Sequence, residues 1–218
     1  MKILLYAITL CIPFMSFGQS SDEVITKLQA KFKKVKEYTV KAQIDTRLPF
    51  IKMLPVSAQI LYKQPDVFKV ESKGIAIIPR QGFDQIGKLI NNSGAFTVVP
   101  QGTAELQGVL TQVVTLIPNQ DTGEVLVGKL WIDPVKIVVL KSQLTTRSNG
   151  TVSADFVYGT QAVNALPDKI TFSIDTKKFK IPKAMTGDMN SSARPKPETP
   201  SDTKGSITIY LSNYIVKY

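Results

Sequence analysis

Histidine is absent from the 218 residues, and the single cysteine, Cys11, lies in an apolar run near the N-terminus. These two residue types are the commonest soft metal ligands and supply many catalytic bases and nucleophiles. Their scarcity excludes a zinc or iron–sulfur centre and Cys/His catalysis. The sequence also lacks the G-x-S-x-G, G-x-x-x-x-G-K and G-x-G-x-x-G motifs of hydrolases and nucleotide-binding proteins. We therefore expect a binding protein with no catalytic residues, no metal ligands and no cofactor.

The composition is that of a globular chain with a basic excess. Hydrophobic residues make up 43% of the sequence, and the 13 glycines and 13 prolines show no fixed period, which favours one domain over a repeat protein. Basic residues outnumber acidic ones by 27 to 17, giving a formal net charge of +10. Such a charge suits nucleic acid or an anionic membrane surface as a partner. Export, indicated by the N-terminal segment, argues against nucleic acid.

The N-terminal segment has the features of a secretory signal peptide. Lys2 precedes an apolar run over residues 3–17, and the small residues Ser16 and Gly18 stand before a cleavage point at Gln19. The alternative is a membrane anchor, but the run is shorter than the roughly 20 apolar residues that a span needs, and Pro13 interrupts it. We expect a signal peptide over 1–19 and one extracytoplasmic domain over 20–218.

Hydrophobic periodicity predicts a helix followed by strands. Ser20 and Glu23 form a capping box, and an amphipathic helix is expected over 22–37. From Tyr38 the period changes from 3.6 to 2, with recurring alternation, and short turns favour an antiparallel meander. A short helix is predicted over 83–92, a flexible loop over 182–205 and a final strand over 206–218 that pairs with the main sheet. The expected fold is α+β: a strongly curved antiparallel β-sheet, with the N-terminal helix and the short helix covering its concave face.

Two segments resemble a known family. Residues 58–71, AQILYKQPDVFKVE, look like the strand, K-x-P-x-x-F turn and strand of the LolA-like periplasmic lipoprotein carriers, and Leu130-Trp131-Ile132-Asp133-Pro134 with Lys141-Ser142 looks like their later L-W-I-D-P hairpin. The resemblance implies an unclosed barrel whose apolar cavity shields the acyl chains of a lipoprotein or another lipid. It also implies a periplasmic monomer that exchanges its ligand with inner- and outer-membrane transport partners. Relatives of this fold include an envelope sensor, so a sensor or protein-interaction module is the alternative function.

Two departures from the carriers stand out. The segment Lys73-Gly74-Ile75-Ala76-Ile77-Ile78 replaces their D-G-x-x-L-W hairpin. In the carriers an arginine locks the lid, and Arg47 lies in roughly the corresponding strand without a secure alignment.

Strand parity predicts which side chains line the cavity, because residues two apart share a face. The candidate lipid-binding residues are Val40, Ala42, Ile44, Ile60, Phe68, Val70, Phe156, Phe172 and Ile174. The alternative is that they fill an ordinary core under the N-terminal helix.

Overall fold

The structure is a computed structural model that describes residues 21–48, 51–65, 67–74, 76, 78–79, 94–120, 124–147, 150–175 and 204–218. The helical elements are α1 (Ser21–Lys34) and the 3-10 helix η1 (Thr160–Asn164). The strands are β1 (Glu37–Leu48), β2 (Ile51–Lys52), β3 (Val56–Lys63), β4 (Val67–Ser72), β5 (Phe96–Leu106), β6 (Val109–Pro118), β7 (Val125–Asp133), β8 (Val138–Thr146), β9 (Gly150–Val157), β10 (Lys169–Asp175) and β11 (Lys204–Lys217).

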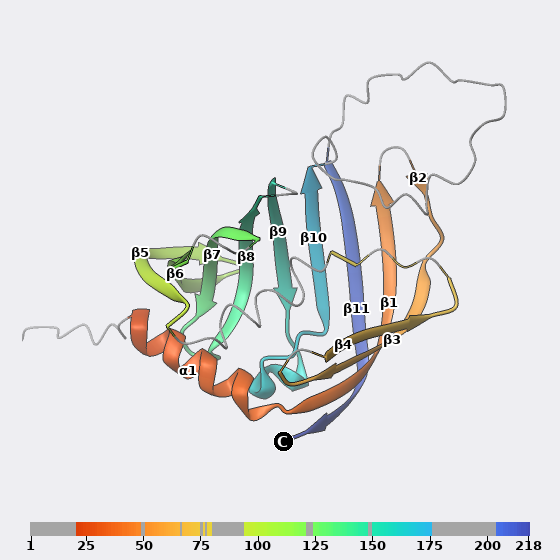
Figure 1. Cartoon of the computed structure of the whole chain (residues 1–218), viewed down its shortest axis with the longest axis horizontal. Helices are drawn as coiled ribbons and strands as arrows, with labels where there is room; N and C mark the ends of the chain where they lie inside the picture. The colour runs from red at the N-terminus through yellow and green to blue at the C-terminus, as the bar shows by residue number, and fades with distance from the viewer. Residues whose placement is uncertain are drawn as a thin grey trace, which may run out of the picture.

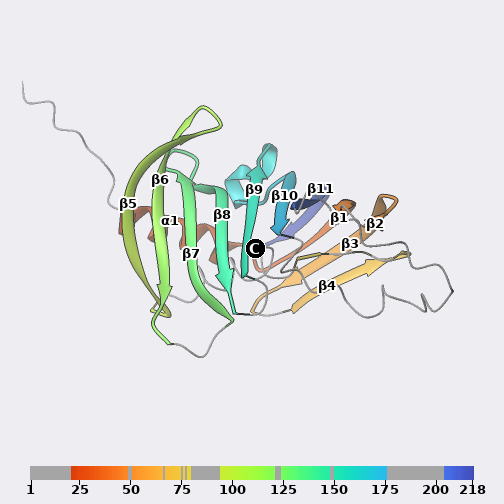
Figure 2. The ribbon, with the colours of Figure 1, turned by 90° about the horizontal axis from the view of Figure 1, so that it is seen from above.

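The described strands form one antiparallel sheet in the order β4-β3-β1-β11-β10-β9-β8-β7-β6-β5, with β2 paired to β1 off this path. The sheet curves strongly, and α1 runs across one end of it (Figures 1 and 2). Strands β5 to β10 follow one another as a meander, and β11 pairs with both β10 and β1. The final strand thus joins the meander to the N-terminal strands. The predicted fold, an open curved antiparallel sheet with an N-terminal helix, is confirmed.

Alternation builds the core, as the sequence predicts. Every second residue of β1, from Tyr38 to Leu48, is buried, while the residues between them are partly or fully exposed. Val138 and Leu140 of β8 pack with Ala165 in a small separate cluster, and most other buried apolar side chains of the central strands join those of α1 in one large hydrophobic cluster. Burial of this cluster is the main stabilising contribution to the fold.

Helix α1 packs its apolar stripe on the sheet and ends earlier than predicted. Val24, Ile25 and Leu28 are buried, and the lysines of the helix face outward or lie at its margin. The helix stops at Lys34 rather than Glu37, because Glu37 already pairs with Lys63 and Lys217 in the sheet. Strand pairing on both sides of β1 therefore prevails over the helical pattern.

Other boundaries differ or lie outside the described residues. Strand β11 begins at Lys204, so the last two residues of the predicted loop belong to the strand. In the strand register Lys204 lies opposite Asp175 of β10. Helix η1 was not predicted. The signal peptide with Cys11, the cap residue Ser20, the predicted helix over 83–92 and the rest of the loop lie outside the described part of the chain. Within the described part, no helix has the length and apolarity required to cross a membrane.

Candidate functional site

Strand register places all nine predicted lining residues on the face of the sheet that α1 covers. One row across the strands joins Val40, Ile60 and Val70, each directly opposite the next. We call this the inner face; the opposite side of the sheet is the outer face.

The other predicted residues extend this face along the strands. Ile44 lies opposite Ile209, which lies opposite Ile170, and Ile170 in turn lies opposite Phe156. The remaining pairs on the face are Ala42 with Ala58, Phe68 with Tyr62, Phe172 with Ile207 and Ile174 with Gly205. The register brings Phe68 and Ile174 to opposite ends of the face, so the nine residues form one continuous surface rather than one compact pocket.

Burial differs across this surface. Seven of the nine side chains are buried, with exposed fractions from 0% to 7%, whereas Phe68 and Val70 on the edge strand β4 are half-buried. The central residues therefore behave as a packed core in this conformation. The edge at β4 is the part of the predicted site that remains accessible.

Sequence reasoning missed the rest of the inner face. Buried residues of this face that were not predicted include Ala58 on β3, Val152 and Ala154 on β9, and, on β6, β7, β8 and β11, Val114, Leu116, Leu130, Ile132, Leu144, Ile207, Ile209 and Leu211. The alternation in 206–218 and in 130–132 was a sufficient signal for the members on β11 and β7. Val98 on β5 lies opposite Leu116 and is half-buried, which gives the inner face an accessible apolar residue at its second edge.

The end of the inner face near α1 is closed by tyrosines. The rings of Tyr38 and Tyr62 stack with centroids 5.1 Å apart, and the ring of Tyr214 meets Tyr38 edge-on at 5.8 Å. The Tyr214 hydroxyl donates a 2.6 Å hydrogen bond to the Pro167 carbonyl oxygen, and burial raises the pKa of Tyr214 well above its usual value. The phenol is thus held neutral, which suits an apolar surface.

Helix α1 is attached to the sheet by long-range polar contacts. The Lys31 ammonium donates to the Lys136 carbonyl oxygen at 2.5 Å and to the Ala162 carbonyl oxygen at 3.1 Å. Burial lowers the pKa of Lys31, and the nearby carboxylate of Asp133 opposes this effect. The turn that follows the L-W-I-D-P segment thus supplies the Lys136 carbonyl oxygen that binds Lys31 of α1.

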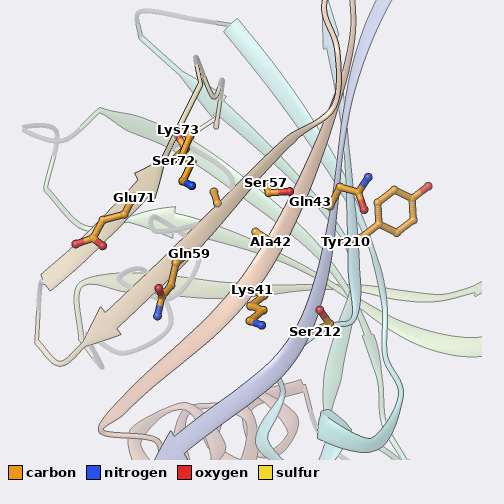
Figure 3. A pocket seen from close by; sticks show the side chains of 11 residues that line it. Lys41, Ala42, Gln43, Ser57, Gln59, Glu71, Ser72, Lys73, Tyr210 and Ser212 are labelled. Atoms are coloured by element: carbon orange, nitrogen blue, oxygen red, sulfur yellow. The ribbon is translucent and has the colours of Figure 1, made fainter.

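A hollow of about 650 Å³ lies on the outer face, over β4, β3, β1 and β11 (Figure 3). Its lining combines Ala42 and Ala58 with the polar residues Lys41, Gln43, Ser57, Gln59, Glu71, Ser72, Lys73, Tyr210 and Ser212. Charged and amide groups lose hydration when an acyl chain covers them, so this hollow suits an acyl chain less well than the inner face does. Of the nine predicted lining residues, Ala42 is the one that also borders this hollow.

Arg47 also belongs to the outer face. Its guanidinium lies 2.9 Å from the Asp45 carboxylate, and its side chain is 78% exposed. Its neighbours Thr46 and Leu48 are buried on the inner face. Arg47 therefore does not reach the inner face, and the sheet gives it no position from which to lock a cover over that face.

Solved structures with this architecture are found in several bacteria. The chain matches a LolA superfamily protein from Nitrosomonas europaea with a TM-score of 0.50 and 10% identity, over 89% of this chain and 94% of that one. The present chain has a LolA-like fold. The match to a proposed outer membrane lipoprotein-sorting protein domain from Vibrio parahaemolyticus has a TM-score of 0.54 and 10% identity, over 89% of this chain and 91% of that one.

A third structure, a DUF1329 family protein from Desulfovibrio piger, matches with a TM-score of 0.53 and 9% identity over 89% and 91% of the two chains. No protein-family model matches the sequence, and no curated protein is significantly similar to it. The resemblance noted in the two hairpins is therefore confirmed as a shared LolA-like fold. Identities of this size establish the fold alone.

Proposed function

We propose that this protein is a non-enzymatic periplasmic carrier that shields the acyl chains of a lipoprotein or another lipid on its inner face. The observation that carries the proposal is the continuous apolar surface that the register builds across β4, β3, β1, β11, β10 and β9. The outer membrane lipoprotein-sorting role proposed for the Vibrio domain supports the same class of ligand.

The energetics suit an acyl ligand. Burial of one methylene stabilises a complex by about 0.8 kcal/mol, so 12 methylenes give on the order of 10 kcal/mol before the costs of binding are subtracted. No catalytic group is required for this interaction. The ligand instead needs an apolar surface without charge, and among the buried residues of the described chain Asp133 is the one charged member. Asp133 is occupied in a turn, where its Oδ1 accepts hydrogen bonds from the Val135 and Lys136 amides at 2.8 and 2.9 Å.

We infer that a ligand enters at the β4 edge. Phe68 and Val70 are half-buried there, whereas Ile60 and Phe172 deeper on the face are fully buried. A chain that reaches the deeper residues must displace the side chains that now cover them. In the proposed role, the protein exchanges its ligand with inner- and outer-membrane partners. Nucleic acid has no part in this role.

The test is a titration of delipidated protein with a fluorescent long-chain fatty acid. We expect saturable binding that Phe68→Asp abolishes, because a carboxylate on the inner face opposes an acyl chain. Val67→Asp is the matched control: Val67 is the neighbouring residue, lies on the outer face and is 38% exposed, so its change leaves binding intact. Circular dichroism establishes that both variants are folded, and Phe68→Ala gives a milder second test.

The proposal fails if the delipidated wild-type protein binds no fatty acid, or if the two carboxylate variants weaken binding equally. A folded wild-type protein that binds no lipid would favour the alternative function of envelope sensor or interaction module.

A further inference from the structure

The two edges of the described sheet are protected to different degrees. Edge strand β5 contains Pro100, which has no amide hydrogen, and its pairing with β6 shifts register between Pro100 and Thr103, around Gly102 at φ +83°. Proline and bulges are the devices by which proteins prevent a sheet edge from pairing with another chain. Edge strand β4 has neither device: its six residues pair with β3 without a register shift.

The side chains of β4 are exposed or half-buried along the whole strand. Strand β4 has a described strand on one side only, and none of its six residues is buried. An edge with regular geometry presents backbone amides and carbonyls that can accept a further strand. The side chains of β4 then decide which strand fits.

The charges of β4 are complementary to a second copy of the same strand. In an antiparallel pair related by a two-fold axis at Val70, Lys69 of one copy lies opposite Glu71 of the other, and the symmetry makes this pair twice. Val70 lies opposite Val70 on the inner face, in line with Ile60 and Val40. Registers centred on Lys69 or Glu71 place like charges opposite each other, which is unfavourable. Within the described chain neither Lys69 nor Glu71 is engaged in an ion pair.

We propose that β4 is a self-association edge, at which two copies of this chain join their sheets through antiparallel β4–β4 pairing centred on Val70. The pairing adds backbone hydrogen bonds and two Lys69–Glu71 contacts on the outer face. Glu71 also lines the outer hollow, so Lys69 of the second copy comes to lie at its rim. A dimer of this kind departs from the monomer that the family resemblance implies, and its interface shares Val70 with the proposed lipid-binding face.

The test is sedimentation equilibrium of the whole protein and of four variants over a range of concentrations. We expect the wild type to show a concentration-dependent dimer. Lys69→Glu and Glu71→Lys each place like charges in both contacts, and each weakens dimerisation by about tenfold or more. The double variant Lys69→Glu/Glu71→Lys restores opposite charges and returns the dissociation constant close to that of the wild type. Glu105→Lys, a charge reversal on the other edge strand β5, has no effect.

A wild type that remains monomeric at every concentration overturns the proposal. So does a double variant that is as weak as the single variants, because the register then is not the one centred on Val70. Thermal unfolding of each variant establishes that it is folded, so loss of the dimer cannot be attributed to loss of the fold. Since fatty-acid binding is measured separately, failure of this proposal leaves the carrier function untouched.

Discussion

The side-chain amide of Gln64, in the turn between β3 and β4, donates a 2.8 Å hydrogen bond to the carbonyl oxygen of Val35, just beyond the end of α1. The same Nε2 lies 3.1 Å from the Phe32 carbonyl oxygen, and the Gln64 backbone amide donates a hydrogen bond to the Lys36 carbonyl oxygen. The last carbonyls of a helix lack intrahelical partners. Gln64 therefore caps the C-terminal end of α1, although it lies about 30 residues away in the sequence.

Replacement of Gln64 by alanine removes the side-chain donor from the Phe32 and Val35 carbonyls and keeps the backbone amide that bonds the Lys36 carbonyl. We expect Gln64→Ala to lower the free energy of unfolding by about 1 kcal/mol, measured by urea denaturation. Gln59→Ala removes the same amide from an exposed position on the outer face of β3 and is expected to have no effect. Equal stability of the two variants would show that the Gln64 contacts do not hold the helix end.

The turn after β7 depends on Asp133. Asp133→Ala leaves the Val135 and Lys136 amides without an acceptor and is expected to cost about 1–3 kcal/mol. Asp133→Asn keeps a side-chain oxygen at the same place, so its cost should be clearly smaller. Urea midpoints of the two variants test this difference; if asparagine is as harmful as alanine, the charge rather than the hydrogen bonds stabilises the turn.

Two tyrosines should remain protonated at alkaline pH. Burial raises the pKa of both Tyr158 and Tyr214 above the usual value of about 10, and their hydroxyls donate to the carbonyls of Val139 and Pro167. The folded state keeps these protons while the unfolded state releases them, so the free energy of unfolding falls as the pH rises above about 10.

Ultraviolet titration of tyrosinate checks this prediction by comparison of the wild type with Tyr158→Phe/Tyr214→Phe. The two native titration curves should coincide up to the pH at which the wild type unfolds. A smaller tyrosinate signal from the variant near pH 10, while both proteins are folded, would mean that the two phenols ionise like exposed ones.

Truncation of a side chain should destabilise the protein more at the centre of the inner face than at its β4 edge. Phe172 is fully buried, so Phe172→Ala is expected to cost about 3–5 kcal/mol. Phe68 is half-buried, and Phe68→Ala should cost no more than about 2 kcal/mol because part of its surface already contacts solvent. Thermal or urea unfolding gives both values. Equal costs would mean that Phe68 belongs to the packed core and does not form an accessible edge.

Strand parity was sufficient to predict the inner face where one side of a strand is exposed. All nine candidate residues fall on that face, because alternation in β1, β3, β4, β9 and β10 reflects one buried and one open side. Parity fails for β6, where the consecutive residues Val113 and Val114 are both buried. Val113 lies opposite Trp131 on the outer face, and Lys129 and Lys141 flank that ring at 5.0 and 5.7 Å. Side chains around Trp131 thus bury Val113 on the outer face, so β6 does not show the alternation of buried and exposed residues.

Other features depend on contacts that no local pattern contains. The end of α1 is set by Gln64 and by the pairing of Glu37, which join segments far apart in the chain. The outer hollow arises from side chains of four strands, two of them at opposite ends of the sequence. Its position follows from the sheet order, which periodicity does not determine.

The central claim is that acyl chains lie on the inner face, and photoaffinity labelling tests it most directly. A long-chain fatty acid with a photoreactive diazirine group is bound to the delipidated protein and irradiated, and the labelled residues are identified by peptide mass spectrometry. If this claim holds, we expect labels on inner-face residues of the β4 edge and its neighbours, above all Phe68, Val70 and Ile60. Labels confined to the outer face, around Gln43, Gln59 and Tyr210, would contradict it.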